Sequence, residues 1–197
     1  MTNLEFRALV VSCLTLITLS VYGQNLRFPS DIILSKTSLS QKLFDNYVER
    51  IFVFGERSFW YKNLDYFVIK QNENDLEFFQ VTISKRNNHR QLGRAKSKRI
   101  YVNKDEANKI IYYMDSVGLW NFSSDSLNLN SKPQTDGSML MTEVFDGSQY
   151  DLEMMTDSSR ILIRVDNPEV LQRFVFTQQR AIFIECKNDL LDLFRRY

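Results

Sequence analysis

The chain has few of the residues on which cofactor sites and covalent cross-links depend. Its 197 residues include one histidine, two cysteines, three prolines and six glycines. So little proline and glycine, together with 44% apolar residues, excludes a disordered, linker-like or collagenous chain. No P-loop, dinucleotide-binding, serine-hydrolase or zinc-protease motif occurs in the sequence. We therefore expect a folded chain without a metal site or another cofactor.

An excess of charge of one sign is also missing. The chain has 25 Lys and Arg against 24 Asp and Glu, a net charge of +1, which excludes a histone-like polycation and an acidic tail. The basic residues are nevertheless segregated, because residues 85–99 contain no acid. The basic residues of this segment are Lys85, Arg86, Arg90, Arg94, Lys96, Lys98 and Arg99, with His89 among them.

We call residues 85–99 the basic segment, and Asn87, Asn88 and Gly93 predict that it forms a loop between two strands. Its seven basic residues are the candidate site for an anionic ligand, such as a lipid phosphate, an acidic glycan or an acidic protein partner. The segment has no interleaved aromatic residues for base stacking, which argues against nucleic acid. Contact with a membrane surface stays open. The alternative is a solvated hairpin tip whose charge keeps the chain in solution.

Residues 8–22 form an uncharged stretch rich in Leu, Val and Ile that precedes Gly23, Gln24 and Asn25. This pattern predicts a signal peptide over residues 1–23, a lead-in over residues 24–37 and an exported protein, periplasmic or extracellular. Glu5 departs from the usual positive start of a signal peptide. The alternative is a retained membrane anchor, because about 20 apolar residues span a bilayer.

Cleavage after Gly23 would remove Cys13 and leave Cys186 as the only thiol, so we expect no disulfide within the mature chain. Cys186 lies in an apolar segment, which predicts a buried structural thiol. About 174 residues can bury roughly 70% of the surface of the unfolded chain without a disulfide. We expect a single domain over residues 38–197.

The spacing of apolar residues predicts both helices and strands. Residues 38–49 and 104–117 have helical periodicity, and the second helix is capped by Asn103 and ended by Gly118. Residues 139–145 and 150–155 flank Asp146 and Gly147 and predict a hairpin. Asn167 is expected to cap a helix that begins at Pro168. The remaining strands are predicted from β-branched and aromatic runs at residues 51–54, 66–69, 76–84, 100–102 and 160–165.

These elements predict an α+β fold in which antiparallel strand meanders pack against helices. A basic strand leads into a helix twice, near residues 98–103 and 159–168. This recurrence raises the option of two similar halves, residues 38–122 and 138–197. The alternative is that any antiparallel α+β chain produces such a pairing by accident.

One stretch of the chain resembles a known group of proteins. The residues that carry the resemblance are Gly118, Leu119, Trp120, Asn121, Phe122, Asp136, Gly137, Glu143, Gly147, Tyr150 and Pro168. An aromatic helix end, an Asp-Gly loop and a Glu-containing hairpin in this order resemble small exported bacterial proteins. The chain departs from that pattern at Met139 to Met141, where an aromatic residue is more usual. The resemblance implies an envelope protein and the hairpin register, and it implies no activity.

Together these features predict a non-enzymatic exported protein of the cell envelope that binds a partner through the basic segment. They do not predict an oligomeric state. The alternative is a carboxylate-dependent hydrolase of an envelope or extracellular polymer, since a glycosidase needs only two Asp or Glu residues roughly 5–10 Å apart. Glu143, Asp151 and Glu153 would lie on adjacent strands of the predicted hairpin. Against this, alternating charged residues usually mark the solvated face of a strand.

Overall fold

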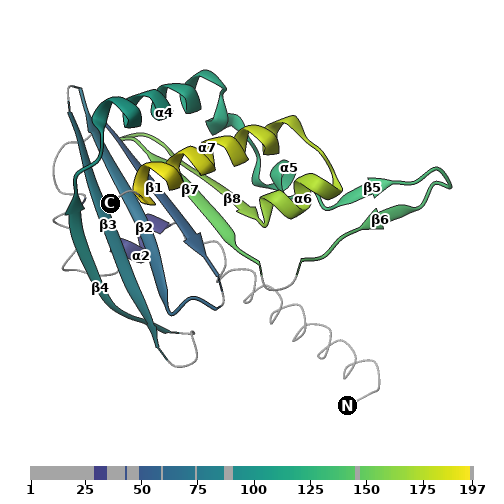
Figure 1. Cartoon of the computed structure of the whole chain (residues 1–197), viewed down its shortest axis with the longest axis horizontal. Coiled ribbons are helices and arrows are strands. Elements are labelled where there is room, and N and C mark those ends of the chain that lie inside the picture. Colours follow the sequence, from purple (N-terminus) through teal and green to yellow (C-terminus); the bar gives the residue numbers. More distant parts are fainter. Residues whose placement is uncertain are drawn as a thin grey trace, which may run out of the picture.

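The computed structural model describes residues 29–34, 43, 49–58, 60–73, 75–86, 91–144 and 147–195. Within these ranges the chain forms a six-stranded antiparallel sheet in the order β4-β3-β2-β1-β7-β8, a separate two-stranded sheet and several helices (Figure 1). This arrangement confirms the predicted α+β class. The predicted signal peptide and nearly all of the helix expected at residues 38–49 lie outside the described residues.

The strands of the large sheet come from both ends of the chain. Their bounds are β1 (Arg50–Arg57), β2 (Asn63–Asn72), β3 (Asp75–Arg86), β4 (Gln91–Ile100), β7 (Gln149–Met155) and β8 (Arg160–Asp166). The small sheet consists of β5 (Ser131–Pro133) and β6 (Met139–Met141). The helices are α2 (Pro29–Leu34), α4 (Lys104–Ser116), α5 (Ser124–Leu127), α6 (Pro168–Phe174) and α7 (Gln178–Arg195), with a 3₁₀ turn at Leu119–Asn121.

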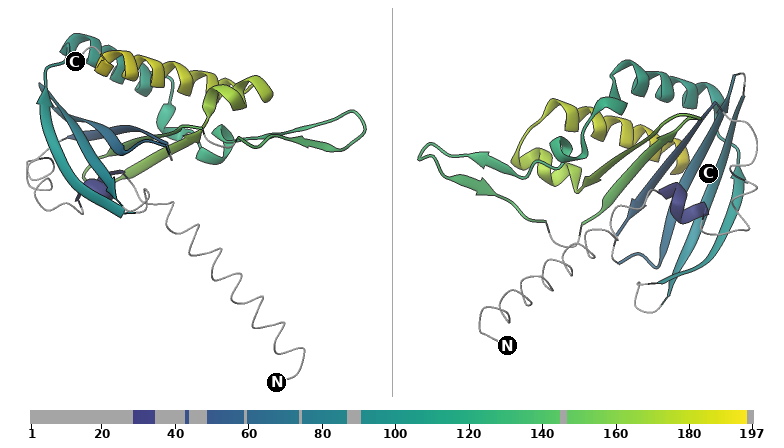
Figure 2. Two further views of the ribbon diagram at one scale, coloured as in Figure 1. Left: turned by 60° about the horizontal axis from the view of Figure 1, so that its bottom comes forward. Right: turned by 180° about the vertical axis from the view of Figure 1, so that it is seen from behind.

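Each face of the large sheet has its own core, because successive side chains of a strand point to opposite faces. Helices α4 and α7 lie on one side, which we call the helix face (Figures 1 and 2). Its core includes Phe52, Phe54, Ile69, Phe78, Ile111, Met114, Phe183 and Leu190. The opposite side, the outer face, has a core that includes Ile33, Ile51, Val53, Tyr66, Val68 and Val81. Since β1 to β3 are buried on both faces, their apolar runs are nearly continuous.

The local signals at helix ends are mostly confirmed. The Asn103 side chain accepts hydrogen bonds from the backbone N–H groups of Asp105 and Glu106, and Gly118 adopts a left-handed φ of 65° after α4. Pro168 begins α6 as expected. Asn167 stands at the capping position, but its side chain makes no capping hydrogen bond. It lies instead against Gly147, where a Cβ atom would come within 1.3 Å of the Asn167 Oδ1.

The hairpin predicted from residues 139–145 and 150–155 is wrong. Strand β6 pairs with β5, whereas β7 pairs with β1 and β8. The Asp-Gly signal is local and says only that the chain can turn there. It does not show that β7 pairs better with β1, about a hundred residues away, and with β8, across the turn at residues 156–159. The two blocks of sequence consequently contribute four strands and two strands to one continuous sheet.

Candidate functional site

The described residues of the basic segment lie in strands, residues 85–86 in β3 and residues 91–99 in β4, so the loop prediction is wrong for them. Strand β4 pairs with β3 from Ile100, opposite Phe78, to Gln91, opposite Arg86. The register shifts between Ile83 and Lys85, which places an extra residue in β4 near Gly93. A bulge of this kind accommodates glycine in an edge strand, and for that reason Gly93 does not end the strand.

The seven basic residues do not converge on one site. Lys85 donates a hydrogen bond from Nζ to the Ser58 carbonyl at 2.7 Å, and burial followed by the nearby Arg57 charge lowers the Lys85 pKa. Arg99 lies on the outer face and pairs with Glu77 at 3.0 Å. Arg86 ends β3, but its side chain lies outside the description, as does the whole of Arg90.

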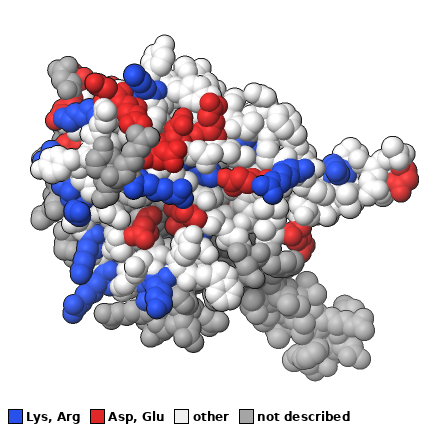
Figure 3. Space-filling model, viewed as in Figure 1, with Lys and Arg blue, Asp and Glu red and all other residues white. Residues whose placement is uncertain are grey.

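The other three basic residues form a row along the edge of the sheet. Arg94, Lys96 and Lys98 occupy alternate positions of β4 and are exposed on the helix face. Two residues of a strand span roughly 6.8 Å, so the row covers about twice that length. Figure 3 shows basic side chains gathered along the left side of the molecule, over β4. We call these three residues the cation row.

The β3 residues opposite the cation row are uncharged. Gln80 pairs with Lys98, and Thr82 pairs with Lys96. Among the described residues, no ion pair involves a member of the cation row. The three charges are therefore accessible to an anion from solution.

Polar side chains continue from the cation row across the helix face. The cross-strand register aligns, from β7 to β4, Tyr150, Glu56, Asp65, Thr82 and Lys96 in one row. The neighbouring row contains Phe67, whose ring stacks on Phe194 near the end of α7 at 4.2 Å. The sheet thus changes from apolar to polar next to the last turn of α7.

Glu56 is the centre of a hydrogen-bond cluster in this polar row. Its Oε1 accepts from the hydroxyls of Ser148 at 2.6 Å, Tyr61 at 3.1 Å and Tyr150 at 3.2 Å. Burial, and then the negative charge of Glu56, raise the pKa of Tyr150, so this phenol stays protonated and remains a donor. Asp65, directly opposite Glu56, accepts from the Thr82 hydroxyl at 2.6 Å. The sequence analysis did not select this carboxylate pair, because only the register of β1 and β2 makes the two residues neighbours.

The three carboxylates that the sequence analysis selected do not form a site on one hairpin. Asp151 and Glu153 point to the outer face from β7 and are fully buried. Glu143 follows β6 in the chain and lines a separate pocket of about 330 Å³ together with Asn130 and Asp166. The catalytic option built on these three residues therefore loses its geometric basis.

Asp151 and Glu153 are structural. Arg57 pairs with Asp151 through its Nε at 2.6 Å, and Arg164 pairs with the same carboxylate at 2.7 Å. Glu153 accepts hydrogen bonds from the Ser30 backbone N–H at 2.9 Å and its hydroxyl at 2.5 Å, and it pairs with Arg160 at 2.9 Å. Glu153 thereby attaches α2 to the outer face of the sheet.

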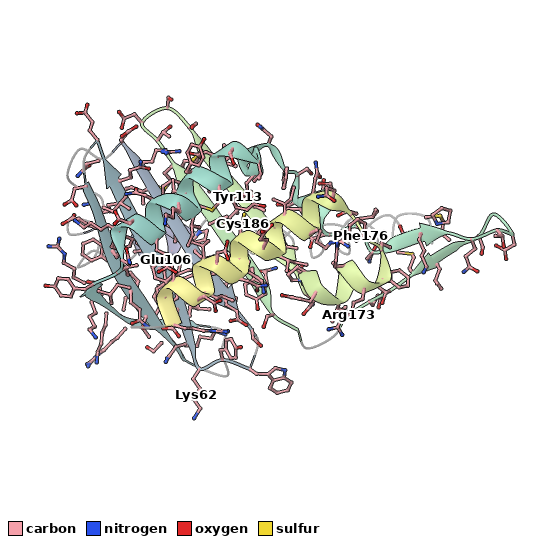
Figure 4. The ribbon with its side chains drawn as sticks, turned by 45° about the horizontal axis from the view of Figure 1, so that its top comes forward. Lys62, Glu106, Tyr113, Arg173, Phe176 and Cys186 are labelled. Atoms are coloured by element: carbon pink, nitrogen blue, oxygen red, sulfur yellow. The ribbon has the colours of Figure 1, made fainter. Side chains whose placement is uncertain are left out.

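Cys186 lies on α7 (Figure 4) and is buried in the core of the helix face, which confirms the predicted structural thiol. Burial raises its pKa to about 12, so the reactive thiolate is scarce near neutral pH. Within the described ranges, no three Asp, Glu, His or Cys side chains are grouped so that they could hold a metal ion. In the same part of the chain, no helix is long and apolar enough to cross a bilayer.

Neither models of known protein families nor curated protein sequences match this chain. Two features of the helix face bear on its function, the cation row and the Glu56–Asp65 pair.

Proposed function

We propose that this chain is a non-enzymatic binding protein of the cell envelope or exterior, and that the cation row of β4 holds an extended anionic ligand. The observation that carries the proposal is the placement of Arg94, Lys96 and Lys98 on one exposed side of an edge strand, opposite uncharged residues. The cations follow one another at a spacing of roughly 6.8 Å along the strand. This spacing matches a polymer with regularly spaced negative groups, such as an acidic glycan. Export is supported by the uncharged run at residues 8–22.

The same charges also protect the edge of the sheet, because Lys and Arg on an edge strand discourage pairing with another chain. Protection alone would require charge and no particular ligand. Binding requires that the three cations act together on one anion. The two roles differ in whether removing the cations changes ligand capture.

Neutralising the cation row tests the proposal. A variant with Arg94→Gln, Lys96→Gln and Lys98→Gln should bind heparin, used as a model polyanion, about 3- to 150-fold more weakly, because each of the three exposed ion pairs contributes roughly 0.2–1 kcal/mol. Its binding should also depend less on salt, since fewer charges are screened. Isothermal titration calorimetry at several salt concentrations measures both effects.

The matched control removes the same charge elsewhere. Lys62, Lys109 and Arg195 are exposed and belong to no ion pair among the described residues, and Figure 4 shows Lys62 pointing away from the body. Their triple Gln variant should keep most of the affinity. Equal losses in the two triple variants would mean that only net charge matters, which would contradict a site on β4.

A second candidate function rests on Glu56 and Asp65. Two carboxylates directly opposite on adjacent strands repel each other, and here they share a cross-strand row of the helix face with Lys96, from which Thr82 of β3 separates Asp65. We propose as the alternative that they hydrolyse an acidic glycan held by the cation row, one as a general acid and the other as a nucleophile or general base.

Release of reducing ends from uronic-acid polysaccharides measures this activity. If the wild-type chain releases them, Glu56→Gln and Asp65→Asn should each lower the rate about 10²- to 10⁴-fold, because each removes an acid–base group. Asp157→Asn, which changes an exposed acid in the β7–β8 turn, should leave the rate unchanged. A wild-type chain that releases none rules out hydrolysis of these polymers and leaves the binding function.

A further inference from the structure

Strands β5 and β6 form an arm that projects from the body of the molecule (Figures 1 and 2). Its three β6 residues are consecutive and apolar, and they are largely exposed: Met139 56%, Leu140 40% and Met141 62%. Consecutive residues point to both faces of the arm, so neither face is a solvated polar side. A lone two-stranded hairpin is at best marginally stable in water. These features indicate that the arm is completed by another strand.

Hydrogen bonds within the arm show which edge is open. The Thr142 N–H donates to the Asn130 carbonyl at 2.9 Å, and the Gln134 N–H donates to the Ser138 carbonyl at 2.8 Å. Because bonded pairs alternate along an antiparallel ladder, the backbone groups of Met139 and Met141 point away from β5. In the described residues no strand pairs with them. The outer edge of β5 is closed differently, since Pro133 has no N–H to offer there.

The two edges of the large sheet are less available than the edge of β6. The cation row lies on β4, where charge opposes strand addition. On β8, the Arg164 N–H donates to the Ser124 hydroxyl at 3.0 Å. The Asn128 side-chain amide donates to the Arg164 carbonyl and accepts from the Asp166 N–H. Side chains therefore cover that edge over Arg164 and Asp166.

We propose that the occupant of the β6 edge is β6 of a second copy of this chain, paired antiparallel about a twofold axis at Leu140. In this register Leu140 meets Leu140 of the partner subunit, and the outward backbone groups of Met139 meet those of Met141 of the partner subunit. This register agrees with the alternation of an antiparallel ladder. Met139 and Met141, whose backbone groups point outward, would form the hydrogen-bonded pairs with the partner subunit, and Leu140, whose backbone groups point toward β5, would form the non-hydrogen-bonded pair between them. The result is a four-stranded sheet shared by two chains, a symmetric self-complementary contact.

Charge favours a second copy at this edge. Residues 137–142 carry no charge, so pairing two copies of β6 places no like charges opposite each other. The nearest cation, Lys132 on β5, has its Nζ over the Phe174 ring at 4.9 Å from the centroid. Two copies of β4, by contrast, would bring their cation rows together.

The contact is small, so the dimer should be weak. Three paired residues from each chain bury less than the roughly 800 Å² per partner of a standard interface. Antiparallel arms bring the tip of one arm to the base of the other. We expect a dissociation constant in the range of weak complexes, about 1–100 µM.

Disulfide trapping tests the register. In the full chain with Cys13→Ser, a Leu140→Cys variant should cross-link readily under mild oxidation, because directly opposed residues at a non-hydrogen-bonded pair have Cα atoms about 4.5 Å apart. Met139→Cys is the matched control. Its two copies would lie roughly 8 Å apart, beyond the reach of a disulfide at about 7 Å. We expect at least a tenfold higher yield of covalent dimer for Leu140→Cys.

Sedimentation equilibrium up to about 500 µM tests the dimer without cross-linking. The wild-type chain should dimerise, and Leu140→Lys should weaken this association at least tenfold. Tyr112→Lys, which removes an exposed apolar residue from α4, should not. A wild-type chain that stays monomeric would overturn self-pairing and leave the edge to a strand of a different protein. Equal cross-linking of the two cysteine variants, or a dimer unaffected by Leu140→Lys, would also overturn it.

Discussion

An Arg180→Met variant should unfold with a free energy about 3–5 kcal/mol below that of the wild-type chain. Arg180 is fully buried near the start of α7, and among the described residues its side chain donates to three backbone carbonyls and to no carboxylate. Its guanidinium donates to Leu127 at 2.6 Å, Leu129 at 2.7 Å and Val175 at 2.6 Å. Methionine fills similar space and leaves these three carbonyls without their donor.

The position of Arg180 explains the size of this effect. The three carbonyls belong to the end of α5, the lead into β5 and the end of α6, so one side chain joins three segments at the base of the arm. Burial lowers the pKa of Arg180, because the buried guanidinium loses its hydration and no carboxylate is among its hydrogen-bond acceptors in the described residues. The planar guanidinium has five N–H donors and can therefore reach three separate carbonyls. A lysine ammonium is a compact group with three donors and cannot span the same three acceptors as well.

Thermal and urea unfolding measure the loss. For a chain of this length, 3–5 kcal/mol lowers Tm by roughly 6–20 °C. Arg180→Lys should lie between the wild type and Arg180→Met. Arg173→Met is the matched control, since Arg173 on α6 is exposed and should change stability by less than about 0.5 kcal/mol (Figure 4). If Arg180→Met is as stable as the control, the three hydrogen bonds do not hold the junction.

Replacing Asp151 with asparagine should also cost about 3–5 kcal/mol of unfolding free energy. The Asp151 carboxylate is fully buried between Arg57 and Arg164, whose side chains are only 19% and 12% exposed. Asparagine keeps the shape but removes the negative charge, so two mostly buried guanidiniums lose the carboxylate that they share. The phenol of Tyr66, whose pKa is raised mainly by burial, finds no hydrogen-bond partner among the described residues and cannot replace that charge.

A double-mutant cycle separates charge from packing. Adding Arg57→Met to Asp151→Asn removes one of the two guanidiniums that shared the carboxylate and should recover part of the lost stability. Chemical denaturation of the two single variants and the double variant gives the coupling energy. If the losses of unfolding free energy in the two single variants add up to the loss in the double variant, the coupling energy is zero, and the Arg57–Asp151 ion pair adds nothing to stability beyond its two side chains taken separately. Asp157→Asn in the adjacent turn is the control with the same chemical change at an exposed site.

Several elements were predictable because their signals are local. The helix after Asn103 follows from a capping side chain, helical spacing and Gly118, all within sixteen residues. The strands at residues 51–54, 66–69 and 76–84 follow from their composition, and the hairpin joining the last two follows from the short polar turn between them. The α+β class results from these elements, since apolar strands and amphipathic helices must cover each other.

The site was predictable only in part. The basic composition of residues 85–99 is visible in the sequence, but the separation of its members between two faces depends on the pairing of β4 with β3. The same holds for Glu56 and Asp65, which become neighbours through register alone. Asp151 and Glu153 were interpreted as solvent-facing because alternating acids usually are, whereas arginines from other strands allow them to be buried.

By itself the sequence determined the class of the fold, the termini of its best-defined helices, the excess of positive charge in one segment and the burial of Cys186. These properties depend on neighbours along the chain, where backbone geometry restricts the outcome. The tertiary structure alone decided which charges are paired and buried, which cations remain accessible on β4, and that β6 leaves an apolar edge exposed. Those depend on contacts between residues as much as 130 positions apart, such as Ser30 and Arg160, and no local pattern specifies such partners.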